Sequence, residues 1–535
     1  MTTGPNDPDV FLPEEQAQDI FRSTIVPALL DPMIAKAPAD ALRLRLVLSG
    51  PAGAGKSELA ALINPVHIDV DLFKGFHPRY IEMMRADEQA ADELLLPDAR
   101  RFFEWAVDHL VDAGVPAVIE HGLRDRNVYD SLMNLLTAPE KPQLPVEVAV
   151  MGTPYAWSLL GDLERYQKNY ETIGFGRFVP EAHLRVRLEH LSTVADWADS
   201  DPRVSSVSVY RQGSTEPVFQ KERGTPRGLR AALEAERQRP RDFDESRAFL
   251  RRHGSLAPRM TPEWRDLVHS TMSTAEPLLA PEARTGPVHD KNAVTFGRYQ
   301  LVSIAHLDTV RAIAMDWPKV TVGVIDIDAQ PSEALAVPPH LEDFYRDCDA
   351  NTAPQKNPMT LDERISLWQT ALHAAGLQDR VTVQAVPRPE LDPKGFNAAF
   401  PSDEYDVVFP APSGKGFDGS RNANFEEILD RDVKAVEPPL EYHTSTIRES
   451  YRSGGQTWRR AFAPGTLDTF IAMDGPRRLL GAGTAPSQEQ SAVSLVSMMR
   501  PGTTSSRLEA ANKPDNTLAG PPPPSQSTDP NQPER

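Results

Sequence analysis

The chain has 535 residues, with 57 Lys or Arg against 76 Asp or Glu, which gives a net charge of −19. This length predicts two or three domains, and the acidity argues against broad, nonspecific nucleic-acid binding. The sequence has no run of about 20 apolar residues to span a membrane, and its polar, acidic start is not expected to be a secretory signal. The single cysteine, Cys348, excludes an intrachain disulfide framework and a cysteine-rich zinc site. We therefore expect a cytoplasmic protein with no membrane or nucleic-acid partner.

Strand-like and helical segments alternate through the first part of the chain. An amphipathic stretch at 14–30 precedes them, and residues 97–113 have a helical pattern. The strand-like segments lie at 44–49, 66–70, 117–120, 146–151 and 204–210. This rhythm predicts an α/β domain over residues 1–225, in which helices flank a mostly parallel sheet.

The rest of the chain divides into three parts. Residues 226–290 are rich in Arg, Glu and Pro and predict a helical appendage and linker. A second α/β alternation opens at Val294 and predicts a further domain over 291–480, with strands at 320–327, 380–386 and 406–409 and a helix at 360–375. Residues 481–535 are rich in Ser, Thr, Gly and Pro, a composition that predicts a disordered tail.

The most informative motif is G-P-A-G-A-G-K-S at 50–57, between a strand-like and a helical segment. It fits the phosphate-binding loop G-x-x-x-x-G-K-[ST], in which glycines let backbone N–H groups turn toward phosphates. The glycines are Gly50, Gly53 and Gly55. Lys56 would reach the β- and γ-phosphates, and Ser57 would ligate Mg²⁺. The motif predicts a site for ATP and Mg²⁺; the alternative is a glycine-rich turn with no ligand.

Acidic residues follow the next two predicted strands. Asp69 and Asp71 stand at or just beyond one strand end, and Glu120 ends the next strand. Open α/β sheets bind ligands at the carboxyl ends of their strands, and a spacing of two places Asp69 and Asp71 on one strand face. One carboxylate could take a proton from an acceptor hydroxyl, and the other could serve Mg²⁺ or hold the loop. The alternative is a helix cap or a solvated turn.

Three arginines come later in the same region. Arg124 follows Glu120 closely, Arg165 lies on a predicted helix, and Arg177 lies in a predicted loop. Arginine side chains that reach a phosphate loop can neutralise the charge of a transferring phosphoryl group. Each of them, taken alone, could equally be a surface charge.

The ordered set of motifs over about residues 40–220 resembles the zeta toxin family of bacterial kinases. The matching segments are the phosphate loop, I-D-V-D-L-F-K-G-F-H-P, V-I-E, L-G-D-L-E-R-Y, and Arg177 followed by P-E-A-H. The resemblance implies phosphorylation of the 3′-hydroxyl of a UDP-N-acetyl sugar with ATP and Mg²⁺. The roles that it implies are Lys56 as phosphate-loop lysine, Asp71 as catalytic base, Glu120 as substrate-binding acid, and Arg165 and Arg177 as phosphate clamps. Asp69 and Arg124 are further substrate-binding candidates.

Two departures from the family touch the acceptor pocket. The family's E-G-T-x-R reads E-H-G-L-R here, and one residue is missing between Arg177 and Pro180. The acceptor is therefore expected to be a nucleotide sugar, a nucleoside or a mononucleotide. An antitoxin-like inhibitor is a further expected kind of partner, although no neighbouring segment for one is evident in the sequence.

The second α/β region resembles the nicotinamide-mononucleotide adenylyltransferase family. Residues 294–306, V-T-F-G-R-Y-Q-L-V-S-I-A-H, are similar to the family's opening, which contains G-R-F-Q-P-F-H-x-G-H. His306 aligns with the second histidine of that motif, Ser303 with the first, and Ala305 with the glycine. Segments beginning at 357 and 443 resemble two later family motifs, and the second of these includes Arg448.

This resemblance implies a Rossmann-like nucleotidyltransferase domain. His306, Arg298 and Arg448 would neutralise a triphosphate, since the chemistry needs charge neutralisation and alignment more than covalent help. The alternatives are a satisfied core histidine at 306 and a decayed module retained for binding or assembly.

We expect a two-domain, ATP-using enzyme that phosphorylates one metabolite and then nucleotidylates it. The alternative is a toxin or effector whose kinase acts on sugar nucleotides while the second domain only senses a dinucleotide.

Overall fold

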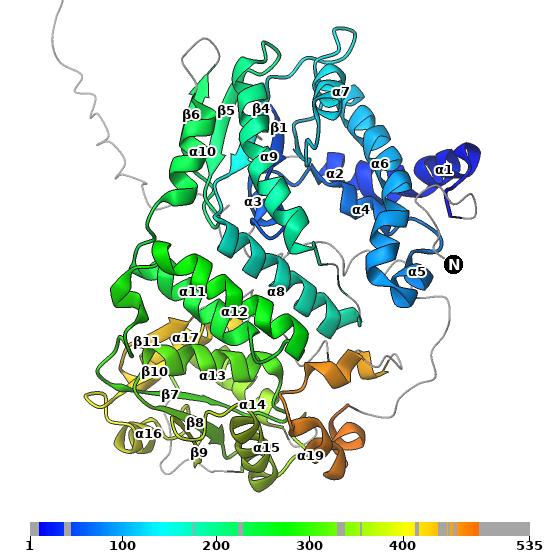
Figure 1. Ribbon diagram of the computed structural model, residues 1–535. Coiled ribbons are helices and arrows are strands. Elements are labelled where there is room, and N and C mark those ends of the chain that lie inside the picture. Colours follow the sequence, from blue (N-terminus) through cyan, green and yellow to red (C-terminus); the bar gives the residue numbers. More distant parts are fainter. Residues whose placement is uncertain are drawn as a thin grey trace, which may run out of the picture.

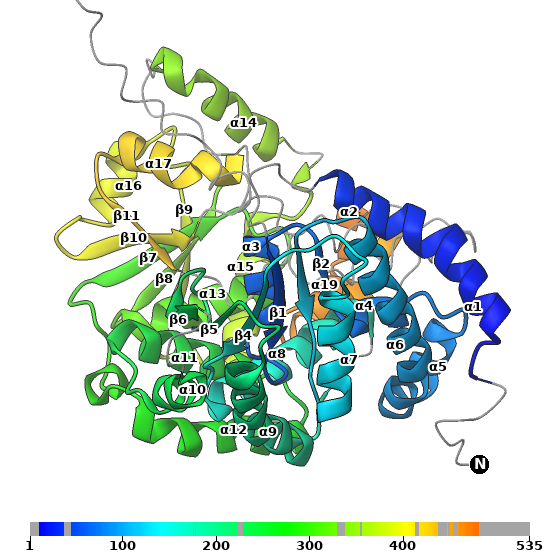
Figure 2. The ribbon, with the colours of Figure 1, turned by 90° about the horizontal axis from the view of Figure 1, so that it is seen from above.

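The computed structural model describes residues 10–36, 44–174, 176, 178–222, 228–328, 337–353, 356–411, 417–436, 447, 450–452 and 457–480. Two sheets with flanking helices make up most of these residues (Figures 1 and 2). Arg177, Arg448 and the tail predicted at 481–535 lie outside the described residues. None of the helices that the structure describes is long and apolar enough to cross a membrane.

The first sheet has the order β2-β3-β1-β4-β5-β6, in which β6 runs antiparallel to its neighbour and the other pairs are parallel. Its strands are β1 (Arg45–Ser49), β2 (His67–Ile68), β3 (Ala117–Glu120), β4 (Val146–Met151), β5 (Ser206–Tyr210) and β6 (Pro217–Glu222). Alternate side chains of a strand point to opposite faces. Val47 and Val148 therefore join one core, and Leu46 and Ala149 join another on the other face. The parallel α/β arrangement agrees with the sequence prediction, whereas the polar, exposed β6 was not predicted.

Helices cover both faces of this sheet. They are α1 (Glu14–Ile20), η1 (Phe21–Leu30), α2 (Asp31–Ala35), α3 (Lys56–Ile63), α4 (Val70–Lys74), α5 (Tyr80–Ala86), α6 (Glu88–Asp112), α7 (Arg126–Leu136), α8 (Tyr155–Ile173), α9 (Glu181–Ser200) and α10 (Leu229–Gln238). The amphipathic stretch at 14–30 packs on this domain as expected, with Ile25 and Leu29 in the main core. Helix α6 is longer than predicted and continues through Pro97, because Ala91 and Leu95 before it pack against α5.

The strand predicted at 66–70 is wrong beyond Ile68. Strand β2 ends there, and Asp69 caps helix α4 by accepting a hydrogen bond from Leu72 N at 2.8 Å. Asp71 lies in the first turn of that helix, so the two carboxylates do not share a strand face. Aspartate is a preferred helix N-cap. The hydrogen bond that Asp69 accepts from Leu72 N therefore favours a helix cap over a strand end, the two conformations that the sequence allowed.

The second sheet is parallel throughout, with the order β11-β10-β7-β8-β9. Its strands are β7 (Asn292–Gly297), β8 (Val320–Ile325), β9 (Val381–Val386), β10 (Tyr405–Pro410) and β11 (Val433–Val436). The surrounding helices are α13 (Ile304–Asp316), η4 (Pro339–Leu341), α14 (Glu342–Thr352), α15 (Leu361–Ala374), α16 (Pro393–Ala399), α17 (Phe417–Leu429), η6 (Thr457–Ala461), α19 (Thr466–Ala472) and η7 (Pro476–Leu480). Taken from β9, the strands follow in the order 3-2-1-4-5, so the order in which successive strands are added to the sheet reverses at β7, between β8 on one side and β10 on the other.

Further helices lie between the two sheets, as Figure 1 shows. They are α11 (Phe243–Leu256), α12 (Pro262–Ala275), η2 (Glu276–Leu278) and η3 (Pro281–Arg284). Helices α11, α12 and η2 share a hydrophobic core with α8. In that core the ring centroids of Trp157 and Phe249 are 4.4 Å apart, and those of Tyr166 and Trp264 are 5.4 Å apart. The described part of the segment predicted as a helical appendage and linker therefore packs against α8.

Candidate functional site

The phosphate-binding loop joins β1 to α3, and its glycines meet specific steric demands. Gly53 and Gly55 have φ values of 70° and 86°, which residues with a side chain rarely adopt. A Cβ at Gly53 would lie 2.1 Å from Ser158 O, and a Cβ at Gly50 would lie 2.9 Å from the Met151 side chain. The loop therefore packs directly on β4 and α8.

Lys56 and Ser57 begin the helix after the loop. Lys56 Nζ donates to Pro51 O at 2.8 Å, so the side chain curls over the loop. Burial lowers the pKa of Lys56, and the nearby carboxylates of Glu120 and Asp69 act in the opposite direction. The Ser57 side chain lies close enough to Glu120 to help lower the pKa of its carboxyl. The fold thus brings the loop lysine and serine together with the predicted acids.

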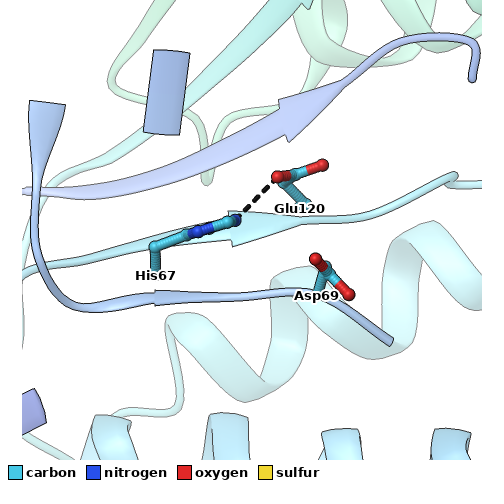
Figure 3. A group of neighbouring side chains, drawn as sticks. All are labelled: His67, Asp69 and Glu120. Carbon is cyan, nitrogen blue, oxygen red and sulfur yellow. Dashed lines mark hydrogen bonds and ion pairs between the residues drawn. The ribbon is translucent and has the colours of Figure 1, made fainter. Parts of the chain in front are cut away.

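Adjacent strands place His67, Asp69 and Glu120 on one side of the sheet edge (Figure 3). The parallel register pairs Ile68 with Ile119, and Asp69 follows Ile68 in extended backbone, just as Glu120 follows Ile119. His67 precedes Asp69 by two residues and therefore points to the same side. Its Nε2 lies 2.7 Å from Glu120 Oε1. The histidine thus holds one of two neighbouring carboxylates.

The pKa values of His67, Asp69 and Glu120 are shifted in different directions. Burial, with the neighbouring charges of Glu120 and Asp71, raises the pKa of Asp69 to about 6. Burial also acts to raise the pKa of Glu120, but the hydrogen bond from His67 and the charge of Lys56 lower it overall. Burial acts to lower the pKa of His67, and Glu120 outweighs that effect and raises it. Paired carboxylates with separated pKa values are typical of sites in which one acid binds and another moves a proton.

The same three side chains could surround a cation. Their ligand atoms all lie within 4.8 Å of one another, and imidazole and carboxylate ligands suit several divalent metals. However, the charge of the Lys56 ammonium already acts on both carboxylates, and His67 Nε2 is hydrogen-bonded to Glu120. These contacts favour binding of a polar substrate over a resident metal at this point. For Mg²⁺, the Ser57 hydroxyl with carboxylates beside it offers the oxygen donors that this ion prefers.

Asp71 has a more open environment than Asp69. Its side chain is 45 % exposed and pairs with Lys74, whose Nζ lies 2.9 Å from Asp71 Oδ1. Lys74 is buried and also contacts Asp92 of α6. The base implied by the family resemblance is therefore near the site, on a helix that Lys74 ties to α6.

The predicted arginines take different positions. Arg165 lies on α8, pairs with the fully buried Asp162 and acts electrostatically on Lys56, so it is close to the phosphate loop. Arg124 is 58 % exposed and pairs with Asp125, its Nε lying 3.4 Å from Asp125 Oδ2. The structure thus brings Arg165, but not the Arg124 side chain, into the contacts described for the loop.

In the second region, His306 belongs to the N-terminal cap of α13. Ser303 Oγ accepts from His306 N at 3.3 Å, and Ser303 N donates to His306 Nδ1 at 3.3 Å. Burial lowers the pKa of His306 to about 4, so the ring is neutral at pH 7. Arg298 donates to the backbone oxygen of Asn351. In this conformation His306 is a half-buried member of the helix cap, and it brings no positive charge to a triphosphate.

Sequence patterns did not single out several side chains that shape the first site. His67 holds Glu120, and Lys74 holds Asp71. Thr153 and Ser158 donate from their hydroxyls to loop carbonyls at 3.0 and 2.6 Å. The spacing of two between His67 and Asp69 was a usable signal for the histidine, whereas the hydroxyls lie about 100 residues from the loop in sequence and only the fold brings them there.

A parallel sheet of order 2-3-1-4-5 with a phosphate loop after its central strand fits a phosphate-loop kinase domain. The comparison with known families agrees, because residues 35–223 match the family described as Zeta toxin. The N-terminal region of the chain is therefore a zeta toxin family domain.

Similar curated proteins carry the name Toxin zeta. The protein from Streptococcus agalactiae is 32% identical over 130 residues, which cover 23% of this chain and 44% of that protein. The protein from Enterococcus hirae is 27% identical over 173 residues, covering 31% and 59%. The chain thus spans about half the length of the curated relatives that it matches.

Two solved structures show weaker likeness. One, from the PezAT chromosomal toxin–antitoxin system of Streptococcus pneumoniae, has 18% identity and a TM-score of 0.37, covering 49% of this chain and 97% of that chain. The other, an AvrRxo1-ORF1:-ORF2 complex, has 15% identity and a TM-score of 0.29, covering 49% and 82%. At these TM-scores neither structure carries an argument about function.

Proposed function

We propose that the N-terminal region is an ATP-dependent kinase acting on a hydroxyl of a nucleotide sugar, with UDP-N-acetylglucosamine as the first acceptor to test. The observation that carries the proposal is the placement of Lys56, at the phosphate loop, beside the acid pair Asp69 and Glu120. The zeta toxin match over residues 35–223 supports it. A nucleoside or mononucleotide acceptor remains the alternative within the same reaction class.

In the proposed reaction, the loop amides and Lys56 would hold the β- and γ-phosphates of ATP. Glu120, fixed by His67, would accept a hydrogen bond from a polar group of the acceptor beside the reacting hydroxyl. An aspartate would take the hydroxyl proton as the new O–P bond forms and ADP leaves. Arg165 would neutralise charge on the transferring group. Mg²⁺ held by Ser57 would supply further neutralisation at the phosphates.

The test is ³¹P NMR with mass spectrometry of the full chain, ATP, Mg²⁺ and UDP-N-acetylglucosamine. We expect a phosphorylated sugar nucleotide and ADP. Lys56→Ala should lower kcat roughly 100- to 1000-fold, because it removes a fixed positive charge from the transition state. Lys141→Ala is the control, since Lys141 pairs with Asp108 and Asp112 away from the loop. A Lys56→Ala protein as active as this control would refute the assignment.

The alternative biological role is a toxin or effector kinase. Growth arrest on expression, abolished by Lys56→Ala and retained by Lys141→Ala, would identify that role. Normal growth with an active enzyme would favour a metabolic kinase.

For the second region we propose a nucleotide-binding role, with nucleotidyl transfer slower than in the family that it resembles. The supporting observation is the reversal of strand order at β7, next to β10, since doubly wound sheets bind ligands outside the carboxyl ends of the strands at such a point. Because the His306 ring is neutral and held in the helix cap, the site is better suited to binding a nucleotide than to catalysing nucleotidyl transfer. Calorimetry of the full-length Lys56→Ala protein with NMN and NAD should show heat of binding, and its absence would favour a decayed module.

A further inference from the structure

Helix α8 carries both the support of the phosphate loop and one of the proposed phosphate clamps. Ser158 holds the loop near the start of the helix, and Gly161 lies so close to Gly53 that a Cβ at 161 would approach Gly53 O to 2.4 Å. Arg165 follows one turn later. Because a helix is stiff over this length, the placement of α8 sets the distance between loop and arginine.

The carboxyl end of α8 is held by the second half of the chain. Arg460, in η6, donates from Nη1 to Tyr170 O at 3.0 Å, and its guanidinium lies 4.6 Å from the centroid of the Tyr170 ring. A cation at a helix carboxyl end is favourable because it meets the negative end of the helix dipole. At the C-cap, Gly174 leaves room for this contact, since a Cβ there would lie 2.6 Å from Arg460 Nη1.

A buried arginine joins α8 to the second sheet's first helix. Arg259, between α11 and α12, makes a bidentate pair with Glu171 of α8 at 2.5 and 3.0 Å. Its Nη1 also lies 3.2 Å from Asp308 Oδ2 of α13. The three side chains are at most 4 % exposed. Losing one member of a buried pair leaves an uncompensated charge, so this contact holds α8 and α13 in one relative geometry.

Two described residues that follow α8, Gly174 and Val179, lie against Arg460 and α8 respectively. Val179 N donates to Asp162 Oδ2 at 2.8 Å, and Asp162 also pairs with Arg165. The predicted clamp Arg177 lies between Gly174 and Val179 in the sequence, outside the described residues.

We propose that Arg259 and Arg460 are positioning residues of the kinase site. They hold the carboxyl half of α8, and with it Arg165, at the correct distance from the phosphate loop. The second half of the chain therefore helps to maintain the geometry of the kinase site and is not an independent domain. This inference rests on the proposed kinase function.

The test compares Arg460→Ala with Arg459→Ala in the full chain. Both arginines are exposed on the same element, but Arg459 stacks on Trp458 within its own domain. We expect Arg460→Ala to speed hydrogen exchange of residues 165–174 and to lower kcat for ADP release with UDP-N-acetylglucosamine roughly 10-fold or more, because small displacements of charged groups are costly in catalysis. The KM for ATP and the melting temperature should stay near the parent values. Arg459→Ala should resemble the parent in all of these measurements.

A second variant addresses the buried arginine. Arg259→Lys keeps the charge but loses the bidentate fork, and it avoids leaving two carboxylates without a cation. It should produce the same pattern of faster exchange and lower kcat. Parental exchange at 165–174 in both variants would overturn the inference. If the parent protein releases no ADP, the proposed kinase function fails, and the exchange data alone then decide whether these arginines hold α8.

Discussion

At the scale of single residues, Asp69 and Asp71 are close in sequence but differ in environment. Asp71 matches the base of the zeta toxin family by position, yet it is half exposed and paired with Lys74. Asp69 caps α4 beside Glu120, where burial and neighbouring charges raise its pKa to about 6. A general base works best when its pKa lies near the working pH. The environment therefore favours Asp69, and the family resemblance favours Asp71.

The pH dependence of kcat/KM separates these assignments. Asp69 is protonated below its pKa and deprotonated above it, so a reaction that needs its basic form should accelerate as pH rises through about 6 and level off above pH 7. Asp69→Asn should abolish this step and lower kcat roughly 100- to 10,000-fold. Asp71→Asn should keep this step but move it to lower pH, because it removes one of the charges that raise the pKa of Asp69. An inactive Asp71→Asn protein beside an active Asp69→Asn protein would restore the family assignment.

At the scale of elements, the closest approach in the first site is that of α8 to the phosphate loop. Gly161 and Gly254 both lie in helices, but their surroundings differ. A Cβ at 161 would meet backbone of the loop at 2.4 Å, whereas a Cβ at 254 would meet only Met315 Sδ, at 3.6 Å. The same substitution at the two sites should therefore change stability in opposite directions.

Gly161→Ala should lower the free energy of unfolding by about 1–3 kcal/mol through overpacking, and it should also reduce kinase activity by displacing the loop. Gly254→Ala should raise the free energy of unfolding by up to about 1 kcal/mol, because glycine is a poor helix former. Denaturant unfolding of both proteins, with the same activity assay, provides the comparison. Equal stability of the two variants would show that the loop moves aside at no cost.

At the scale of the whole molecule, the two halves share a core and a buried ion-pair network. Besides Arg259, Arg247 of α11 pairs with Asp316 of α13, and Arg251 also reaches Asp316, at 2.9 Å. Helix α8 buries Trp157 and Tyr166 against α11 and α12. The boundary predicted near residue 225 therefore lies before helices that cover the first domain.

Truncation tests this coupling. A chain ending at residue 225 should melt at lower temperature than the full chain, or aggregate, because it exposes the apolar face of α8. A chain ending at 290 should melt between the two, since it restores α11 and α12 but leaves Arg247 and Arg259 without their partners on α13. Thermal unfolding followed by circular dichroism provides the measurement. A fragment 1–225 that melts with the full chain would show that the halves are energetically independent.

Local chemistry made much of the first domain predictable. The phosphate loop, Lys56 and Ser57 follow from a pattern whose glycines are dictated by backbone geometry. Strands β3 and β4 were predicted with their observed bounds, because their side chains are buried on both faces and produce unbroken apolar runs. Glu120 was placed at a strand end for the same reason.

Several contacts that shape the site could not be predicted from the sequence. Sequence allowed Asp69 to end a strand or cap a helix, and the hydrogen bond from Leu72 N decided for the cap. The parallel register of β2 and β3 brought His67 onto Glu120, a pair 53 residues apart. Burial raises the pKa of Asp69, whereas the hydrogen bond from His67 and the charge of Lys56 lower the pKa of Glu120. Burial also lowers the pKa of His306, so that its ring is neutral at pH 7. The α/β class and the phosphate loop were thus predictable from the sequence, because they depend on short-range geometry. The ion pairs Arg259–Glu171 and Arg259–Asp308 were not, because they depend on how separate helices pack.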